Sequence, residues 1–128
     1  MSTPTDLRFT ESHEWVRVDG NTVTVGITAY AQSSLGDVVY VDMPDVDDAF
    51  SQGDELAEIE SVKAVSNIYA PVSGTVTEVN EDIEDGPEVV NEDPYSAGWL
   101  FKMTLDDASE LDGLLDAAAY DAHTAAAG

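Results

Sequence analysis

The sequence predicts a mainly β protein, in which short antiparallel strands form a flattened sandwich with a few helical turns around it. Three observations support this fold class. Apolar and polar residues alternate in short runs, which is the pattern of half-buried strands. The pair Asp19-Gly20 stands between two of these runs and is a strong signal for a tight β-hairpin. A weak internal repeat favours a fold built from two similar halves.

In chain order, residues 14–18 and 22–27 are expected to form the first hairpin, and a short helix is expected near residues 28–34. Thr28 is available to cap this helix and Gly36 to end it. Further alternating runs predict strands at residues 38–41, 55–61, 64–70, 75–79 and 98–105. In the strands at 55–61 and 64–70, the expected buried side chains are Leu56, Val65, Ile68 and Ala70.

The internal repeat pairs residues 36–41 with 74–79, and residues 53–56 with 86–89. Each copy has a strand that begins at glycine, an acidic turn, and a second glycine before the next apolar residue. Neither half could bury its apolar face alone, so the two are expected to pack as layers related by a quasi-two-fold axis. The turn that joins them would then project from one end.

The C-terminal segment is expected to be helical over about residues 107–124. Asp107 with Glu110 fits a capping box ahead of Leu111, and residues 117–123 are expected to form a second helix. We expect residues 1–128 to form a single domain, with a core over about residues 7–105.

Acidic residues dominate the composition: 27 Asp and Glu stand against 4 Lys and Arg, which gives a net charge of −23 over 128 residues. Nucleic acid is excluded as a partner, because its phosphates would be repelled. The apolar fraction of 43% indicates a folded core with an acidic surface. The composition resembles that of proteins from salt-loving archaea, in which concentrated salt screens such repulsion.

The chain has no cysteine, which excludes disulfides, thiolate nucleophiles and cysteine-ligated metals. Its two histidines, His13 and His123, lie far apart and show no spacing typical of metal ligands. The N-terminus resembles no signal peptide and no stretch approaches the length of a membrane span. We therefore expect a soluble, cytoplasmic protein without membrane contact.

Lys63 is one of only two lysines, and it lies at the expected turn between two strands, with its amine in water. An exposed lysine amine stays charged, which makes it a poor base or nucleophile on its own. A protruding amine held in a fixed turn is a good acceptor for an enzyme that acylates lysines. The residues presenting it would be Glu60, Ser61, Val62 and Ala64. The alternative is a lysine that only keeps a strand edge soluble, but acidic residues serve that purpose elsewhere in the chain.

Several separate motifs, in the same order along nearly the whole chain, resemble the H protein family of the glycine cleavage system. They are residues 60–64 (ESVKA), 25–32 (VGITAYAQ), 35–39 (LGDVV), 70–74 (APVSG), 91–95 (NEDPY) and 98–100 (GWL).

This resemblance implies a lipoyl/biotinyl-type barrel-sandwich hybrid fold, a monomer, and a carrier component that is not itself an enzyme. It implies lipoate in amide linkage on Lys63, attached by a lipoate ligase or lipoyl transferase. The arm would receive an aminomethyl group from glycine decarboxylase (P protein) and pass it to aminomethyltransferase (T protein). Dihydrolipoamide dehydrogenase (L protein) would then reoxidise the dithiol.

By position in the family, Ser12, Glu14 and Asn67 would border a cleft against which the loaded arm folds. Asn67 stands where relatives often have an acidic residue, so Glu14 is the stronger candidate for pairing with an amine. The alternative for Glu14 is a carboxylate on the solvent face of a strand.

Three other functions compete with this one. A biotinyl carrier would present Met-Lys-Met at the tip, whereas this chain has Val62 and Ala64 around the lysine. A lipoyl domain of a 2-oxo acid dehydrogenase acyltransferase would continue into a linker and further domains, whereas helices are expected here. A lipoyl relay protein, or an unmodified interaction module outside glycine cleavage, stays open on the sequence.

Overall fold

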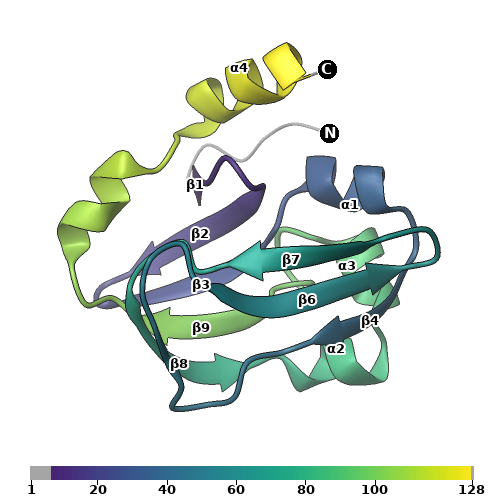
Figure 1. Ribbon diagram of the computed structural model, residues 1–128, viewed down its shortest axis with the longest axis horizontal. Helices are drawn as coiled ribbons and strands as arrows, with labels where there is room; N and C mark the ends of the chain where they lie inside the picture. Colours follow the sequence, from purple (N-terminus) through teal and green to yellow (C-terminus); the bar gives the residue numbers. More distant parts are fainter. Residues whose placement is uncertain (1–6, 128) are drawn as a thin grey trace.

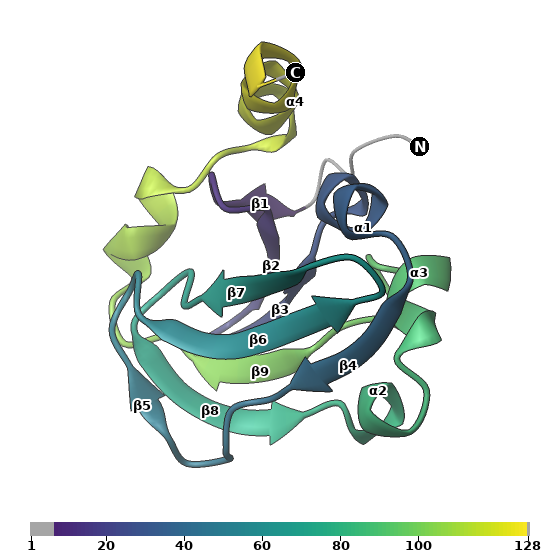
Figure 2. The same cartoon turned by 45° about the vertical axis from the view of Figure 1, so that its right-hand side comes forward.

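The fold is a sandwich of two antiparallel sheets, seen in a computed structural model that describes residues 7–127 (Figures 1 and 2). The larger sheet has the order β1-β2-β3-β9-β8-β5 and the smaller one β4-β6-β7. The strands are β1 Arg8–Phe9, β2 Glu14–Asp19, β3 Thr22–Ile27, β4 Val38–Asp42, β5 Ala49–Phe50, β6 Glu55–Ser61, β7 Val65–Tyr69, β8 Gly74–Val79 and β9 Phe101–Thr104. The helices are α1 Ala29–Leu35, α2 Glu81–Asp85, α3 Glu88–Glu92, the 3₁₀ helix η1 Ala108–Gly113 and α4 Ala117–Ala127.

The first hairpin forms as predicted, because its turn chemistry and its alternation agree. β2 and β3 pair from Glu14↔Ile27 to Asp19↔Thr22, which leaves Gly20 and Asn21 as a two-residue turn. Gly20 has φ +61°, a left-handed value that glycine adopts without strain.

The short helix after the hairpin is also confirmed, with both of its expected ends. The Thr28 side chain accepts a hydrogen bond from the Ala31 N–H at the start of α1, and Gly36 ends the helix with φ +81°. Both residues play the parts that their chemistry predicts.

Most of the core lies between the two sheets. Val16, Val25 and Met103 of the larger sheet contact the same apolar cluster as Ile59 and Ile68 of the smaller one. Each such side chain contributes about 1.5–3 kcal/mol when fully buried, so this cluster is the main stabilising element. A second cluster lies under α4 and contains Leu7, Phe9, Trp15, Ala117 and Tyr120.

Several local predictions were wrong. Val65 is 57% exposed, because β7 turns this side chain to the outer face of the smaller sheet, whereas Leu56, Ile68 and Ala70 are buried as expected. Residues 86–89 lead into α3 instead of a strand, so the second part of the internal repeat has no counterpart in secondary structure. The first part does, since β4 and β8 are both strands.

The helical C-terminal segment is confirmed, but it begins with a 3₁₀ helix and without a capping box. Asp107 caps η1 by accepting from the Ser109 N–H at 3.0 Å. The Glu110 carboxylate instead accepts hydrogen bonds from the Ser73 N–H at 2.7 Å and the Ser73 hydroxyl at 2.8 Å. This long-range contact ties η1 to the turn before β8.

Candidate functional site

The tip of the β6–β7 hairpin is a tight turn organised by Ser61. The buried Ser61 hydroxyl accepts from the backbone N–H groups of Lys63 (3.3 Å) and Ala64 (3.1 Å), and donates to the Ala64 carbonyl (3.2 Å). The Ser61 N–H also donates to the same carbonyl at 2.8 Å. Val62, Lys63 and Ala64 are exposed, so the turn is fixed from within while its side chains face solvent.

Two other elements support the tip. The Val62 N–H donates to the Asp37 carbonyl at 3.0 Å, which ties the tip to the start of β4. From α3, the Asn91 side chain donates to the Gly36 carbonyl and accepts from the Val38 N–H, both at 2.8 Å. A Cβ on Gly36 would lie 3.4 Å from Lys63 Cε, so the stem of this lysine lies over Gly36.

Lys63 differs from the other lysine of the chain in its surroundings. Lys102 Nζ lies 5.2 Å from the centre of the Trp99 ring, an arrangement typical of a cation–π contact. The ammonium of Lys63 has no hydrogen-bond or ion-pair partner among residues 7–127. Of the two amines, Lys63 is the one that the fold leaves available.

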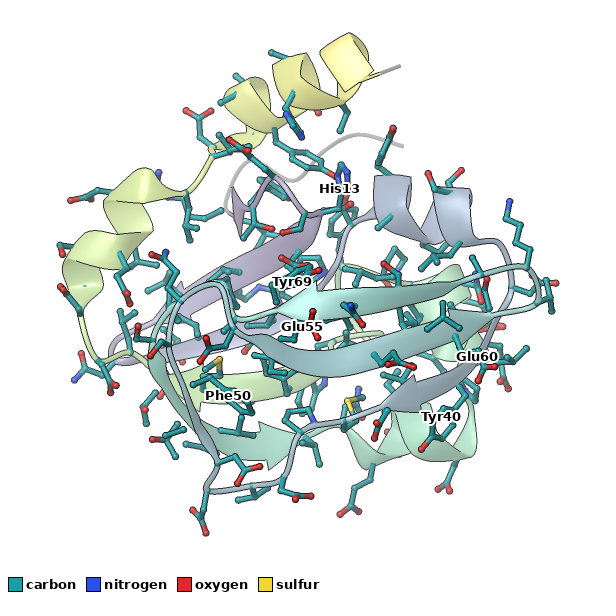
Figure 3. All side chains as sticks on the ribbon, viewed as in Figure 1. His13, Tyr40, Phe50, Glu55, Glu60 and Tyr69 are labelled. Carbon is teal, nitrogen blue, oxygen red and sulfur yellow. The ribbon has the colours of Figure 1, made fainter. Side chains whose placement is uncertain are left out.

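On the outer face of the smaller sheet, Glu60 lies directly behind the tip. It pairs with Tyr40 of β4 and with Val65 of β7, which makes one row across the three strands. Figure 3 shows the side chains of Tyr40 and Glu60 near this end of the sheet.

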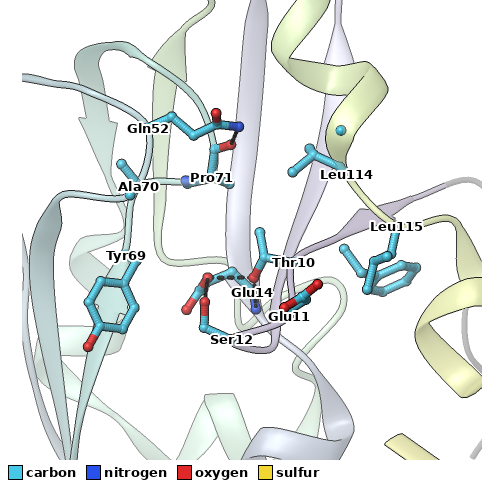
Figure 4. Close-up of a pocket in the computed structure, with 13 residues that line it drawn as sticks. Thr10, Glu11, Ser12, Glu14, Gln52, Tyr69, Ala70, Pro71, Leu114 and Leu115 are labelled. Carbon is cyan, nitrogen blue, oxygen red and sulfur yellow. Dashed lines mark hydrogen bonds between the residues drawn. The ribbon is translucent and has the colours of Figure 1, made fainter. Parts of the chain in front are cut away.

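A pocket of about 220 Å³ lies between the N-terminal segment, the end of β7 and the end of η1 (Figure 4). Its lining includes Thr10, Ser12, Glu14, Gln52, Tyr69 and Leu114. Hydroxyls and a carboxylate therefore share the pocket with apolar side chains, which suits a ligand with a polar end on an apolar arm.

Glu14 is the buried acid of this pocket, with 1% of its surface exposed. Its carboxylate accepts from the Thr10 hydroxyl at 2.6 Å and from the Ser12 hydroxyl at 3.1 Å. Burial raises the pKa of Glu14 above its usual value, and the two hydroxyls with the Tyr69 backbone N–H partly oppose this. Among residues 7–127, no cation contributes to its pKa shift. The alternative of a solvent-facing strand carboxylate is wrong, because the residue is buried.

Of the three residues for which a cleft is expected, Ser12 and Glu14 line this pocket, and Asn67 is not part of its lining. Asn67 is exposed on β7, two residues before Tyr69 and therefore on the same face of the strand. It lies between the lysine tip and the pocket. Sequence reasoning missed Thr10, Tyr69 and Leu114, for which the sequence carries no separate signal.

A two-sheet sandwich that presents one free lysine on a rigid hairpin tip defines a class of protein, the carriers of a covalently attached lipoyl or biotinyl group. Comparisons with known proteins narrow this class. Residues 7–126 match the family model described as glycine cleavage H-protein. The chain belongs to this family.

Two curated relatives have the same name, glycine cleavage system H protein. The protein of Alteromonas mediterranea is 60% identical over 119 residues, which cover 92% of each chain. That of Staphylococcus haemolyticus is 55% identical over 120 residues, covering 94% of this chain and 95% of the relative.

Among solved structures, the glycine cleavage system H protein of Mycobacterium marinum matches with a TM-score of 0.89 and 38% identity. The match covers 96% of this chain and 99% of that one, which confirms the barrel-sandwich fold expected from the motifs. These relatives give no support to an origin in salt-loving archaea, which stays a prediction from composition.

Within residues 7–127, no group of three or more His, Asp or Glu side chains could hold a metal ion. No helix among these residues is long and apolar enough to cross a membrane.

Proposed function

We propose that this chain carries lipoate in amide linkage on Lys63 and moves the aminomethyl group of glycine between the enzymes of the glycine cleavage system. The observation that carries the proposal is the free Lys63 amine on a turn fixed by Ser61, in a chain of the H-protein family. It acts as a carrier and has no catalytic residues of its own.

The bound lipoate would supply a disulfide that can be opened to a dithiol, which this cysteine-free chain cannot provide by itself. The protein itself holds the modified lysine in a fixed, exposed position. Ser61 holds the turn, and the lysine stem lies over Gly36. A tethered group stays at high effective concentration near each docked enzyme.

The pocket around Glu14 is proposed as the resting place of the loaded arm. A buried carboxylate without a cation among its neighbours can accept a hydrogen bond from an amine, while Leu114 and Tyr69 keep water away. From Val65 to Tyr69, β7 spans about 13 Å at ~3.3 Å per residue. Asn67 lies along this path, so in this proposal Ser12 and Glu14 border the resting arm and Asn67 lies beside its route.

The proposed partners are glycine decarboxylase, aminomethyltransferase, dihydrolipoamide dehydrogenase, and the lipoate ligase or lipoyl transferase that modifies Lys63. Glu60, Val62 and Ala64 surround the lysine and would contact each of these enzymes in turn. We further propose that the chain works as a single-domain monomer in the cytoplasm.

The test is lipoylation of Lys63→Arg beside Lys102→Arg, with lipoate, ATP and a lipoate ligase. Intact mass and a peptide map should show one lipoyl group on the unaltered chain and on Lys102→Arg, and none on Lys63→Arg. Because the chain has only these two lysines, the pair of variants assigns the site completely. No modification of a folded sample by an active ligase would contradict the proposal.

The relay and unmodified-module alternatives are separated by a second measurement. A lipoylated chain of the proposed function supports glycine–bicarbonate exchange by glycine decarboxylase, and Lys63→Arg does not. A lipoylated chain that is inactive in this exchange would favour a relay protein.

A further inference from the structure

Residues 10–14, which connect β1 to β2, form one wall of the pocket and have a strained backbone. His13 has φ +73°, a left-handed value that costs a residue other than glycine about 1 kcal/mol or more. The Thr10 N–H donates to the Glu14 carbonyl at 3.0 Å, and the His13 N–H donates to the Thr10 carbonyl at 3.1 Å. Such a conformation persists only where surrounding contacts hold it.

The residues of this connection face two parts of the molecule, the pocket and α4. The hydroxyls of Thr10 and Ser12 point to the Glu14 carboxylate in the pocket. Glu11 and His13 are instead the residues that contact α4, through the Glu11 carbonyl and the His13 ring. The pocket wall is therefore also the surface on which the C-terminal helix lies.

Tyr120 of α4 makes the side-chain hydrogen bond to His13, whose carbonyl also accepts from the Thr28 N–H at 3.0 Å. Its buried hydroxyl lies 2.8 Å from His13 Nδ1 and 2.6 Å from the Thr28 hydroxyl, and its ring stacks on Phe9 at 4.8 Å. The ring of His13 also packs on Tyr30 at 4.7 Å. Figure 3 shows His13 between α4 and α1.

The pKa shifts of Tyr120 and His13 agree with Tyr120 as the donor and His13 as the acceptor of their hydrogen bond. Burial raises the pKa of Tyr120 to about 12, so its hydroxyl keeps its proton and can donate it. Burial and the nearby His123 lower the pKa of His13, so its Nδ1 can accept. The Thr28 hydroxyl then donates to the Tyr120 oxygen, so both hydroxyl protons have an acceptor.

We propose that Tyr120 is a positioning residue of the pocket: through His13 it holds residues 10–14 so that the Thr10 and Ser12 hydroxyls both reach Glu14. The consequence for the loaded arm rests on the proposed function, but the geometry does not. The C-terminal helix thus contributes to the pocket by holding the wall that residues 10–14 form.

The test uses the full chain without lipoate and compares Tyr120→Phe with Tyr30→Phe. Both variants lose one hydroxyl beside His13 and keep a ring, and only the Tyr120 hydroxyl bonds to the imidazole. We expect amide hydrogen exchange at Thr10, His13 and Glu14, whose N–H groups are hydrogen-bonded within the loop, to become about five- to tenfold faster in Tyr120→Phe and to stay unchanged in Tyr30→Phe. The Glu14 carboxyl, followed by NMR, should titrate at higher pH in Tyr120→Phe because its donors are less well held.

His13→Gly gives a second, independent readout. Glycine adopts the left-handed conformation without strain and leaves the Tyr120–Thr28 contact in place, so the variant removes the imidazole contacts to Tyr120, Tyr30 and His123 without disfavouring the backbone conformation. We expect the same faster exchange as in Tyr120→Phe. Wild-type exchange and an unshifted Glu14 titration in both variants would overturn the inference. That result is independent of whether Lys63 accepts lipoate, so the two proposals fail separately.

Discussion

The side chain of Lys63 lies over Gly36, a residue with an unusual backbone conformation. Gly36 has φ +81° and ψ −149°, a region of backbone conformation that is essentially restricted to glycine. A Cβ at this position would lie in ordinary van der Waals contact with the lysine stem, at 3.4 Å from Cε. The requirement for glycine therefore comes from the backbone conformation that ends α1.

Gly36→Ala is expected to lower stability and to slow lipoylation. The backbone strain should cost about 1–3 kcal/mol in the free energy of unfolding, measured with urea. Gly20→Ala is the matched control, because Gly20 also has a positive φ but has nothing within 4 Å of an added Cβ. Only Gly36→Ala should reduce the ligase kcat/KM per folded molecule. Gly36 precedes Asp37, whose carbonyl accepts from the Val62 N–H at the tip, so strain at Gly36 is expected to disturb the lysine turn. Equal rates for the two variants would show that this strain does not reach the tip.

At the scale of elements, α4 is docked by a small number of specific contacts. Its Tyr120 lies in the second apolar cluster, and His123 Nε2 lies 3.2 Å from the Glu11 carbonyl. The rings of His13 and His123 are 5.8 Å apart. The titratable groups around His13 are therefore His123, Tyr120 and Tyr30.

This arrangement predicts that the docking of α4 weakens in mild acid. The pKa of His13 is lowered below 6.5 in the folded protein, so the unfolded chain binds the proton first. The stability that neutral His13 contributes is complete above the unfolded pKa and is lost as pH falls through that value toward the folded one. Glu14 has a raised pKa and the opposite sign, since its protonation favours the folded state on acidification.

The measurement is urea unfolding at about pH 7 and about pH 5.5 for the unaltered chain and for His13→Asn. Asparagine tolerates the left-handed backbone and places an amide near Nδ1 without taking up a proton. The unaltered chain should lose more stability over this interval than the variant, while the contribution of Glu14 is shared by both. Identical losses would mean that His13 does not titrate in this range.

At the scale of the whole molecule, repulsion between acidic groups opposes folding. The net charge is −23, and of the four cations Arg17 and Lys102 lie over the indole rings of Trp15 and Trp99. The Debye length falls from about 10 Å at 0.1 M salt to about 3 Å at 1 M, so salt weakens this repulsion.

The melting temperature is therefore expected to rise with potassium chloride between about 0.1 and 1 M. Sucrose at equal osmolality is the control, because it favours compact states without screening charge. A melting temperature independent of the salt would contradict the prediction and would mean that the acidic groups are already well separated.

Much of the fold follows from local sequence. The first hairpin, the cap and end of α1, and the strand pair around Lys63 all have alternation and turn residues that agree with one another. The helices α2 and α3 were not predicted, because each has only five residues and Gly86-Pro87 between them has the composition of a turn. Val65 was misplaced because a β-prone run does not show which face of a strand will be covered.

By itself, the sequence determined the exposed lysine on a tight turn, the acidic surface and the family motifs, since each depends on neighbouring residues or on composition. Only the tertiary structure decided that Glu14 is the buried one among the acidic residues whose side chains the structure describes. It also brought Tyr120 to His13, which lies 107 positions away in the chain. Local patterns carry no record of such contacts, because they arise when separate elements pack on a common core.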